Sequence, residues 1–171
     1  MKHFKEIPPY EIDRILTRIG KEWMLVSAGD KGSSNTMTAS WGCMGVLWNK
    51  PVAVCFIRPQ RYTYTFTETH DRLSLSFFDG GYRDALTLCG RLSGRDVDKF
   101  AAAGLTLACT DDGVPYPEEA SLVLVCKKLY VDDLKKSSFL DESLLSNYPA
   151  DDFHRVYVCE IEKVLSRHST D

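Results

Sequence analysis

The sequence predicts a mainly β domain in which an antiparallel sheet closes into a barrel, with helices packed on its outside. Six short runs carry the continuous or alternating apolar pattern of β-strands, and few helix-like segments lie between them. Strands and helices do not alternate along the chain, which disfavours a doubly wound α/β fold. Because the 171 residues hold no internal repeat or linker, we expect one domain over residues 1–171, with its core at about residues 12–165.

Local patterns predict where each element lies. A short helix is expected first, since apolar residues recur at helical spacing up to Gly20, and its apolar face would hold Ile12, Ile15, Leu16 and Ile19. Strands are then expected at residues 22–29, 35–42, 52–57, 72–78, 121–131 and 155–165. The turn signals DKGSS and WNKP separate the first three strands, and helical pieces are expected at residues 82–90 and 94–104.

Composition and charge exclude several classes of protein. The net charge of -3 and the pI near 5.8 give no basic field for nucleic acid. No apolar run approaches the roughly 20 residues of a membrane span, and the charged N-terminus does not resemble a signal peptide. The cysteines form no C-x-x-C pair, and the histidines lack metal-ligand spacing. We therefore expect a cytoplasmic protein with free thiols, no metal, and no nucleic-acid or membrane partner.

Common catalytic and nucleotide-binding signatures are missing from the sequence. It contains no G-x-G-x-x-G, no G-x-x-x-x-G-K-[ST], no G-x-S-x-G and no H-E-x-x-H. Residues 58–66, RPQRYTYTF, suggest an anion site instead, because two arginines and several hydroxyls follow an apolar strand. Guanidinium forks and hydroxyls suit an oxyanion, and a surface turn with a proline is the alternative.

A second stretch, CGRLSGRDVDKF at residues 89–100, offers the same chemistry. Ser93 and Asp96 form a capping-box-like pattern, and Arg95 and Lys99 would share one face of the following helix. A glycine turn, free N–H groups and two cations together can bind phosphate. An ordinary capped surface helix is the alternative.

A third stretch, NTMTASWG at residues 35–42, alternates hydroxyls with small and apolar residues. Such an edge lets a flat polar heterocycle lie against the backbone, although a strand with one wet face would show the same pattern. The run RLSLSFF at residues 72–78 allows the same two interpretations, with Ser74 and Ser76 on one face.

Taken together, these stretches resemble the flavin reductase-like family of FMN-binding split barrels, and within it the flavoredoxin-like group. The resemblance is carried, in the family's order, by NTMTASWG, GVLWNKPVAVCFIRPQRYTYTF, LSLSFF, CGRLSGRDVDKF, LVLVCKKLY and HRVYVCEIEKVL. It implies a homodimeric, antiparallel split β-barrel that binds FMN noncovalently near the subunit interface.

The resemblance also implies which residues contact FMN. The ring and the ribityl chain would be held by Asn35, Thr36, Met37, Thr38 and Ser40. The phosphate would lie near Arg58, Tyr62, Thr63, Ser93, Gly94, Arg95 and Lys99, with Arg58 preferred to Arg61 as the inward-pointing arginine. The pocket wall would include Ser76, Phe77 and Phe78.

His154 lies where reductases of this family often carry a histidine close to the nicotinamide, and a surface histidine at a strand start is the alternative. Two cysteines depart from the family's pattern, since Cys43 and Cys159 stand where glycine is usual. The added bulk puts local geometry and substrate access in doubt. A role for these two thiols, or for Cys89 beside the expected phosphate turn, stays open.

The function that the resemblance implies is an NAD(P)H-dependent FMN oxidoreductase, which passes electrons on to free flavin or a partner protein. Hydride transfer between stacked rings requires no acid or base residue, which agrees with the missing catalytic signatures. The alternative is an FMN-binding electron carrier of the flavoredoxin type, which a protein donor reduces without NAD(P)H. The sequence does not choose between NADH and NADPH.

Overall fold

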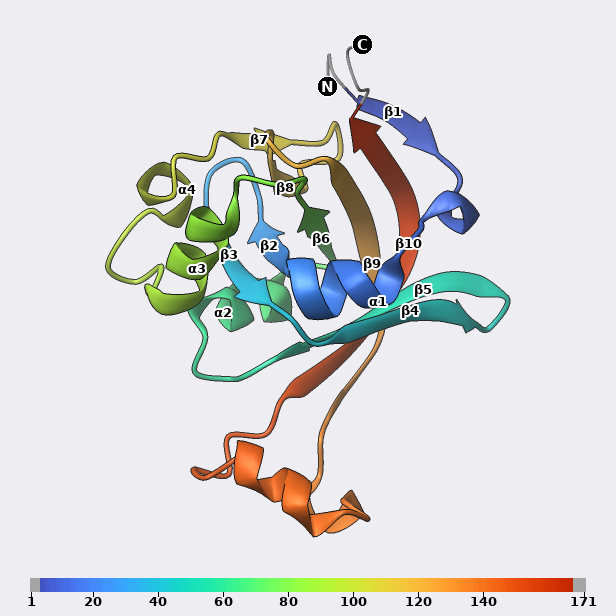
Figure 1. Cartoon of the computed structure of the whole chain (residues 1–171), viewed down its shortest axis with the longest axis vertical. Coiled ribbons are helices and arrows are strands. Elements are labelled where there is room, and N and C mark those ends of the chain that lie inside the picture. Colours follow the sequence, from blue (N-terminus) through green and yellow to red (C-terminus); the bar gives the residue numbers. More distant parts are fainter. Residues whose placement is uncertain (1–3, 168–171) are drawn as a thin grey trace.

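Eight antiparallel strands form the main sheet of the computed structural model, which describes residues 4–167. The strands are β1 (Phe4–Ile7), β2 (Met24–Gly29), β3 (Ser34–Ala39), β4 (Gly42–Leu47), β5 (Lys50–Ile57), β6 (Arg72–Phe77), β9 (Leu122–Asp133) and β10 (Arg155–Arg167). Their order is β3-β2-β6-β9-β10-β5-β4, and β1 pairs with the end of β10. Within residues 4–167 no ladder joins β3 to β4, so the curled sheet is a split barrel (Figure 1). The predicted fold class is confirmed.

Short helices and one small hairpin surround the sheet. They are η1 (Pro9–Glu11), α1 (Ile15–Thr17) continuing into η2 (Arg18–Glu22), α2 (Tyr62–Thr69), α3 (Arg83–Arg91), α4 (Lys99–Ala102), η3 (Lys136–Ser138), η4 (Glu142–Asn147), and the hairpin of β7 (Leu107–Cys109) and β8 (Pro115–Pro117). Helices α2, α3 and α4 gather on the side of β2 and β3, as Figure 1 shows.

The sheet packs against apolar side chains on both faces. Inside the barrel, Leu73, Leu75 and Phe77 of β6 meet side chains from β2, β5, β9 and β10. Outside it, Phe78 packs with residues from α3, α4 and β8. Of the two interpretations of residues 72–78, the strand with one wet face is therefore wrong, because Ser74 is buried and its hydroxyl donates to the Pro115 carbonyl at 2.6 Å.

Three cysteines belong to the barrel interior. Cys55 of β5, Cys126 of β9 and Cys159 of β10 are all buried there as free thiols. Burial raises the pKa of Cys126, and a hydrogen bond with Cys159 together with burial raises the pKa of Cys55. These thiols are packed as small apolar side chains.

Several predicted elements need correction. The first helix does not end at Gly20 but runs on as a wide turn to Glu22, and Leu16 is 88% exposed instead of facing the core. The prediction ended a strand at residue 42 and assigned no element to residues 43–47, whereas residues 42–47 form β4, which the two-residue turn of Trp48 and Asn49 joins to β5. Both turn residues have positive φ, 52° and 57°, as the tight hairpin turn of type I′ requires.

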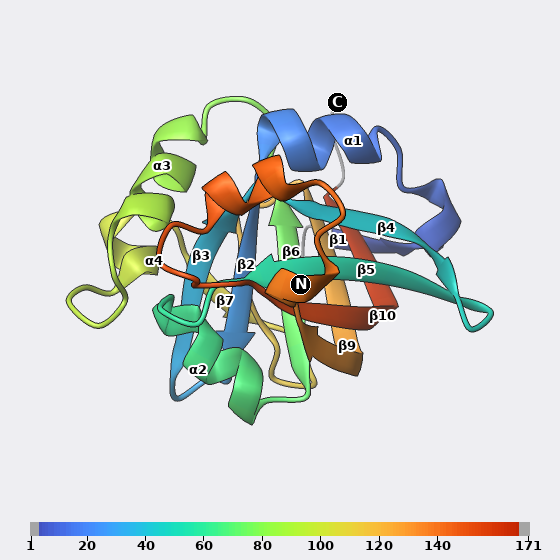
Figure 2. The ribbon, with the colours of Figure 1, turned by 90° about the horizontal axis from the view of Figure 1, so that it is seen from below.

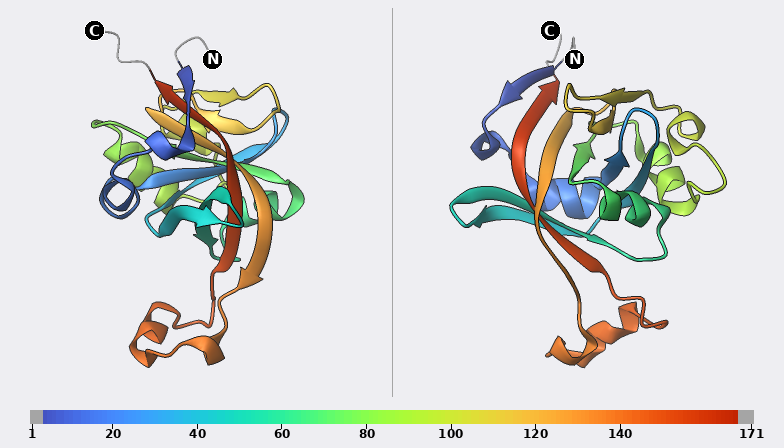
Figure 3. Two further views of the ribbon diagram at one scale, coloured as in Figure 1. Left: turned by 90° about the vertical axis from the view of Figure 1, so that its right-hand side faces the viewer. Right: turned by 180° about the vertical axis from the view of Figure 1, so that it is seen from behind.

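Residues 134–154 form an extension between β9 and β10 that we call the arm. Its two short helices, η3 and η4, stand off from one end of the barrel (Figure 1), and from that end the arm lies in front of the barrel (Figure 2). Figure 3 shows that the strand ends of β9 and β10 lead together into the arm. The arm has its own aromatic cluster, since the ring of Tyr148 lies 4.8 Å from that of Phe153 and 5.8 Å from that of Phe139.

Candidate functional site

A hollow of about 200 Å³ opens where β3 and β5 both end, and we call it the β3–β5 hollow. It is lined by Met37, Thr38, Ala39, Ser40, Trp41, Phe56, Arg58, Arg61 and His154. Because β3 is an edge strand, half of its backbone N–H and C=O groups have no partner strand to bind. The hollow brings together five predicted site residues, which are Met37, Thr38, Ser40, Arg58 and His154.

Arg58 is bound by the arm. One guanidinium nitrogen donates to Asp152 Oδ2 at 2.5 Å, and the other donates to the Asn147 carbonyl at 2.7 Å. The guanidinium also lies 5.1 Å from the ring centre of Tyr148. The hydrogen bond from Arg58 lowers the pKa of Asp152, so the carboxylate stays charged and neutralises the arginine. The arginine that the prediction preferred for a phosphate already has an anionic partner.

His154 is buried at the point where the arm returns to β10. Its Nδ1 lies 2.8 Å from the Tyr148 hydroxyl, and its ring centre is 5.2 Å from that of Trp41. Burial lowers the pKa of His154 to about 4, and the positive charge of Arg58 acts in the same direction. The imidazole is therefore neutral at physiological pH. The alternative of a surface histidine does not describe this position.

Arg61 and Lys99 converge on the C-terminal end of α3. Arg61 donates to the Gly90 carbonyl at 2.9 Å, and Lys99 Nζ donates to the Cys89 carbonyl at 2.9 Å. Neither cation has a carboxylate within salt-bridge distance in the part of the chain that the structure describes. Burial lowers the pKa of both groups, and the charge of Arg61 helps to bring that of Lys99 to about 8. Two partly desolvated cations without a counter-charge favour an anion nearby.

Other predicted residues lie near a second hollow of about 370 Å³, between β3 and α4. Asn35, Tyr62, Gly94 and Lys99 line it. Gly94 meets Asn35 so closely that a Cβ there would lie 2.0 Å from Asn35 Oδ1. Asn35 in turn donates to the hydroxyl of the buried Thr63 at 2.8 Å. These contacts use the Asn35 and Thr63 side chains to join β3 to α2.

The predicted capping box at Ser93 is wrong. The N-cap of α4 is Asp98, whose carboxylate accepts from the backbone N–H groups of Phe100 and Ala101. The Ser93 hydroxyl accepts instead from the Arg95 N–H at 3.2 Å. Because α4 begins at Lys99, Arg95 and Lys99 do not share a helix face, which corrects that prediction.

Arg95 is not among the residues that line the β3–β5 hollow. Its guanidinium rests 4.9 Å from the ring centre of Tyr62 and donates to the Gln60 carbonyl at 3.2 Å. Arg95 therefore offers a matched comparison for Arg61, since both guanidiniums donate to backbone carbonyls but only Arg61 lines the β3–β5 hollow.

Three predicted contact residues lie beneath the site. Thr36, Ser76 and Phe77 have no exposed surface. The Thr36 hydroxyl is bonded to that of Ser27 at 2.9 Å, whereas Ser76 Oγ has no partner in the described part of the chain. These side chains support β3 and β6 from within the fold.

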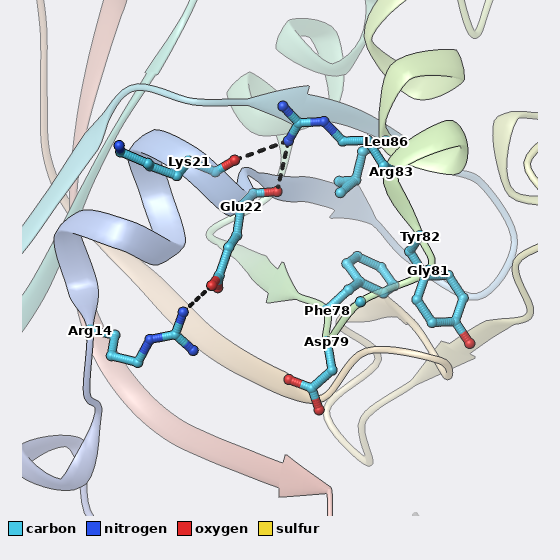
Figure 4. Close-up of a pocket in the computed structure, with 10 residues that line it drawn as sticks. Arg14, Lys21, Glu22, Phe78, Asp79, Gly81, Tyr82, Arg83 and Leu86 are labelled. Atoms are coloured by element: carbon cyan, nitrogen blue, oxygen red, sulfur yellow. Dashed lines mark hydrogen bonds and ion pairs between the residues drawn. The ribbon is translucent and has the colours of Figure 1, made fainter.

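Phe78 lies in a third hollow, of about 340 Å³, between α1 and α3 (Figure 4). There its ring centre is 5.0 Å from that of Tyr82. Arg83 lies over the ring of Trp23 and donates to the Lys21 carbonyl at 3.0 Å. The structure thus separates Phe78 from the residues of the β3–β5 hollow.

The sequence prediction did not include four residues that shape the site, which are Trp41, Phe56, Tyr148 and Asp152. The information that could have identified them is the pairing of β5 with β10, in which Ile57 lies opposite Arg155. One residue further along, Arg58 and His154 must then be neighbours. That register was not available from local sequence patterns.

Two classes of site find no support in residues 4–167. No group of three or more His, Cys, Asp or Glu side chains there is arranged to hold a metal ion. In the same residues, no helix has both the length and the apolar character needed to cross a bilayer.

Comparison with known proteins identifies the family. Residues 16–171 match the model of the flavin reductase like domain, and the chain therefore belongs to that family, as its sequence resemblance predicted. No curated protein sequence matches the chain.

Solved structures share the fold. An FMN-binding protein from Thermus thermophilus with bound p-hydroxybenzaldehyde is 24% identical, with a TM-score of 0.67 over 86% of this chain and 72% of that one. Flavoredoxin from Methanosarcina acetivorans is 22% identical, with a TM-score of 0.67 over 86% of this chain and 69% of that one. An FMN-binding domain of a flavin reductases-like enzyme from Shewanella baltica is 19% identical, with a TM-score of 0.71 over 96% and 77% of the two chains.

The lowered pKa of His154 predicts a pH-dependent stability. Its folded pKa of about 4 lies below the ordinary 6.5, so the unfolded chain binds more protons between these values. The free energy of unfolding should therefore fall as the pH drops from 6.5 to about 4, and His154→Gln should remove part of that fall. Urea unfolding across this range measures it, with the partly exposed His70→Gln as control. An unchanged slope in His154→Gln would contradict the assignment.

Proposed function

We propose that the protein is an FMN-binding oxidoreductase that takes hydride from NAD(P)H and passes electrons to free flavin or to a partner protein. Its membership in the flavin reductase like family supports an oxidoreductase that uses flavin. The observation that carries the proposal is the pair of uncompensated cations, Arg61 and Lys99, beside a hollow at the edge strand β3.

The residues of the hollow suit FMN. Where β3 lines the hollow at Met37 and Thr38, those of its backbone N–H and C=O groups that face away from β2 can meet the polar edge of a flavin ring, and Ser40 follows directly after the strand. Arg61 would bind the phosphate, because Arg58 is neutralised by Asp152. Lys99 is more deeply buried and would act behind Arg61 by adding positive potential.

When FMN is bound, it supplies the hydride-accepting chemistry. The chain's own residues bind the cofactor, orient it and limit water. Trp41 and Phe56 place apolar surface at the hollow, and the neutral His154 contributes hydrogen bonding without charge. A hydride carries its proton and two electrons together, so its transfer requires no catalytic acid or base residue in this proposal.

We further propose that a second copy of the chain completes the cofactor site. A hollow of about 200 Å³ is smaller than the roughly 300–1,000 Å³ of typical ligand pockets, so one chain encloses part of the cofactor. Large apolar side chains near it and along β4 are exposed, among them Trp41, Val46 and Trp48. Sedimentation at micromolar concentration should give a dimer, and a monomer would contradict this proposal.

Replacing Arg61 with Ala should weaken FMN binding by about 1–3 kcal/mol, because a charge-assisted hydrogen bond to phosphate is lost.

Replacing Lys99 with Met should weaken FMN binding at pH 7 by less than the Arg61→Ala replacement does. With wild-type Lys99, whose pKa is about 8, affinity should fall as the pH rises above 8, and Lys99→Met should abolish that decline.

Fluorescence or calorimetric titration with FMN gives these affinities. Arg95→Ala is the matched control, because it removes an arginine that donates to a carbonyl outside the β3–β5 hollow. Equal losses in Arg61→Ala and Arg95→Ala would show that net charge, and not a phosphate contact, governs affinity.

The function itself is tested by an anaerobic titration of the FMN-loaded protein with NADH and NADPH, following the visible flavin absorption. Bleaching within seconds by either nucleotide is the expected result. A flavin that stays oxidised with both would favour an electron carrier reduced by a protein donor, a candidate suggested by the structural likeness to a flavoredoxin. Failure to bind FMN at all would remove both proposals.

A further inference from the structure

The hollow of about 340 Å³ between α1 and α3, which we call the α1–α3 hollow, shares no lining residue with the β3–β5 hollow. Part of its lining is apolar, since Phe78 and Leu86 are buried there beside the ring of Tyr82. Its volume lies within the roughly 300–1,000 Å³ of small-molecule pockets. Size and aromatic lining together suit a ligand that contains a flat ring.

The backbone on one side of the α1–α3 hollow has three uncommon conformations. The segment η2, Arg18–Glu22, is a turn of π-helix, and its last two residues line the hollow. Arg14 before α1 and Trp23 after η2 both have positive φ, 53° and 70°. A π-helical turn is rare and frequent at functional sites, and a left-handed conformation is costly for a residue as bulky as tryptophan. This concentration of uncommon backbone suggests that the hollow has a function.

Two arginines hold this backbone in place. Arg83 of α3 lies over the ring of Trp23 and donates to the Lys21 carbonyl at 3.0 Å. Arg14 donates to the carboxylate of Glu22, and Figure 4 shows this pair across the hollow from the aromatic rings. The backbone around the hollow is therefore held in one arrangement without a ligand, which lowers the entropic cost of binding one.

The charged groups around the hollow favour an anion. Three cations, Arg14, Lys21 and Arg83, line it with two carboxylates, Glu22 and Asp79, which leaves an excess of one positive charge. Among residues 4–167 the Arg14 guanidinium donates only to Glu22, so most of its five N–H groups are available to a ligand. A guanidinium can bind a carboxylate through two parallel hydrogen bonds.

We propose that the α1–α3 hollow is a second ligand site and that it binds a small aromatic carboxylate. The ring would lie against Phe78 and Tyr82, and the carboxylate would bind Arg14 on the opposite side. The excess positive charge disfavours an aromatic amine, and an aliphatic acid would leave the aromatic surface uncovered. This inference does not rest on FMN, because none of the residues that carry it belongs to the β3–β5 hollow.

Three probes test the ligand class in ¹H–¹⁵N correlation spectra of the full chain. Benzoate has a ring and a carboxylate, benzylamine has a ring and a positive charge, and acetate has a carboxylate without a ring. Benzoate should shift the backbone signals of Gly80 and Gly81, which line the hollow, and the response should saturate with a dissociation constant on the order of 1 mM. Benzylamine and acetate should shift these signals far less at the same concentration.

Each other result contradicts a part of the proposal. A response to benzylamine equal to that of benzoate would overturn the charge assignment, and an equal response to acetate would overturn the aromatic contact. A benzoate response confined to Met37 and Thr38 in the β3–β5 hollow, or no saturable response at Gly80 and Gly81, would overturn the site itself.

Arg14→Gln tests the residue that is proposed to bind the carboxylate. It should weaken benzoate binding about three- to tenfold, because a charge-assisted hydrogen bond at a partly exposed position is lost. Arg72→Gln is the matched control, since Arg72 also pairs with a carboxylate, that of Glu162 at 2.7 Å, but does not line the hollow. It should change the affinity by less than about twofold.

Equal losses in Arg14→Gln and Arg72→Gln would show that net charge, and not a contact with the ligand, governs benzoate binding. An unchanged affinity in Arg14→Gln would overturn the role of Arg14. The amide spectrum of each variant also shows whether the fold is kept, so a loss of binding through unfolding is recognised in the same measurement.

Discussion

The hydrogen-bond ladder between β5 and β10 is the constraint on which the rest of the structure depends. β10 is thirteen residues long and pairs with β9 on one side, and with β5 and then β1 on the other. Its pairing with β5 joins the two parts of the sheet into a barrel that stays open only between β3 and β4. The same pairing fixes the positions of the residues just beyond the ladder. Arg58 leaves β5 at the point where His154 enters β10, so their positions are set by backbone register. The arm is attached through the same point, by Asp152 and Tyr148.

The positive charges of the site differ in whether they have a carboxylate partner. Arg58 is neutralised and serves as a structural link to the arm, whereas Arg61 and Lys99 meet only carbonyl groups among the described residues. The C-terminal end of α3 offsets part of their charge through its dipole. Folding keeps them together because α2 and α3 both pack against β3, where the Thr38 hydroxyl donates to the Leu86 carbonyl at 2.5 Å. Under the proposed function, an anion bound beside Arg61 and Lys99 would therefore stabilise the folded chain.

The strand pattern could be read from the sequence, because strands such as β6 and β9 carry long apolar or alternating runs that suit nothing else. Helix α2 could not, since its residues, YTYTFTET, favour a strand by local preference. It is helical because Phe66 and Thr67 are buried against the barrel, where the Thr67 hydroxyl meets that of Tyr157 at 3.0 Å. Tertiary packing overrode propensity there.

In the candidate site, too, local sequence patterns predict some features and tertiary contacts decide the others. The hydroxyl row of β3 and the arginines after β5 were visible as residue types, and the structure places several of them around one hollow. Which arginine is free depended on Asp152, some ninety residues away in the chain, and no local pattern connects the two. Tyr148 and Trp41 were missed for the same reason, since each acquires a role only through contact with His154.

The thiols of Cys55, Cys126 and Cys159 inside the barrel bear on how the protein meets oxidants and labelling reagents. Each is almost completely buried; a hydrogen bond with Cys159 together with burial keeps Cys55 in the unreactive protonated form, and burial does the same for Cys126. A reagent can modify them only when strands separate. In the single chain, Cys43 on β4 is exposed and is reached without any opening. One polypeptide therefore contains both a surface thiol and a set of interior thiols. The rate at which a reagent modifies the interior thiols reports how often the barrel opens.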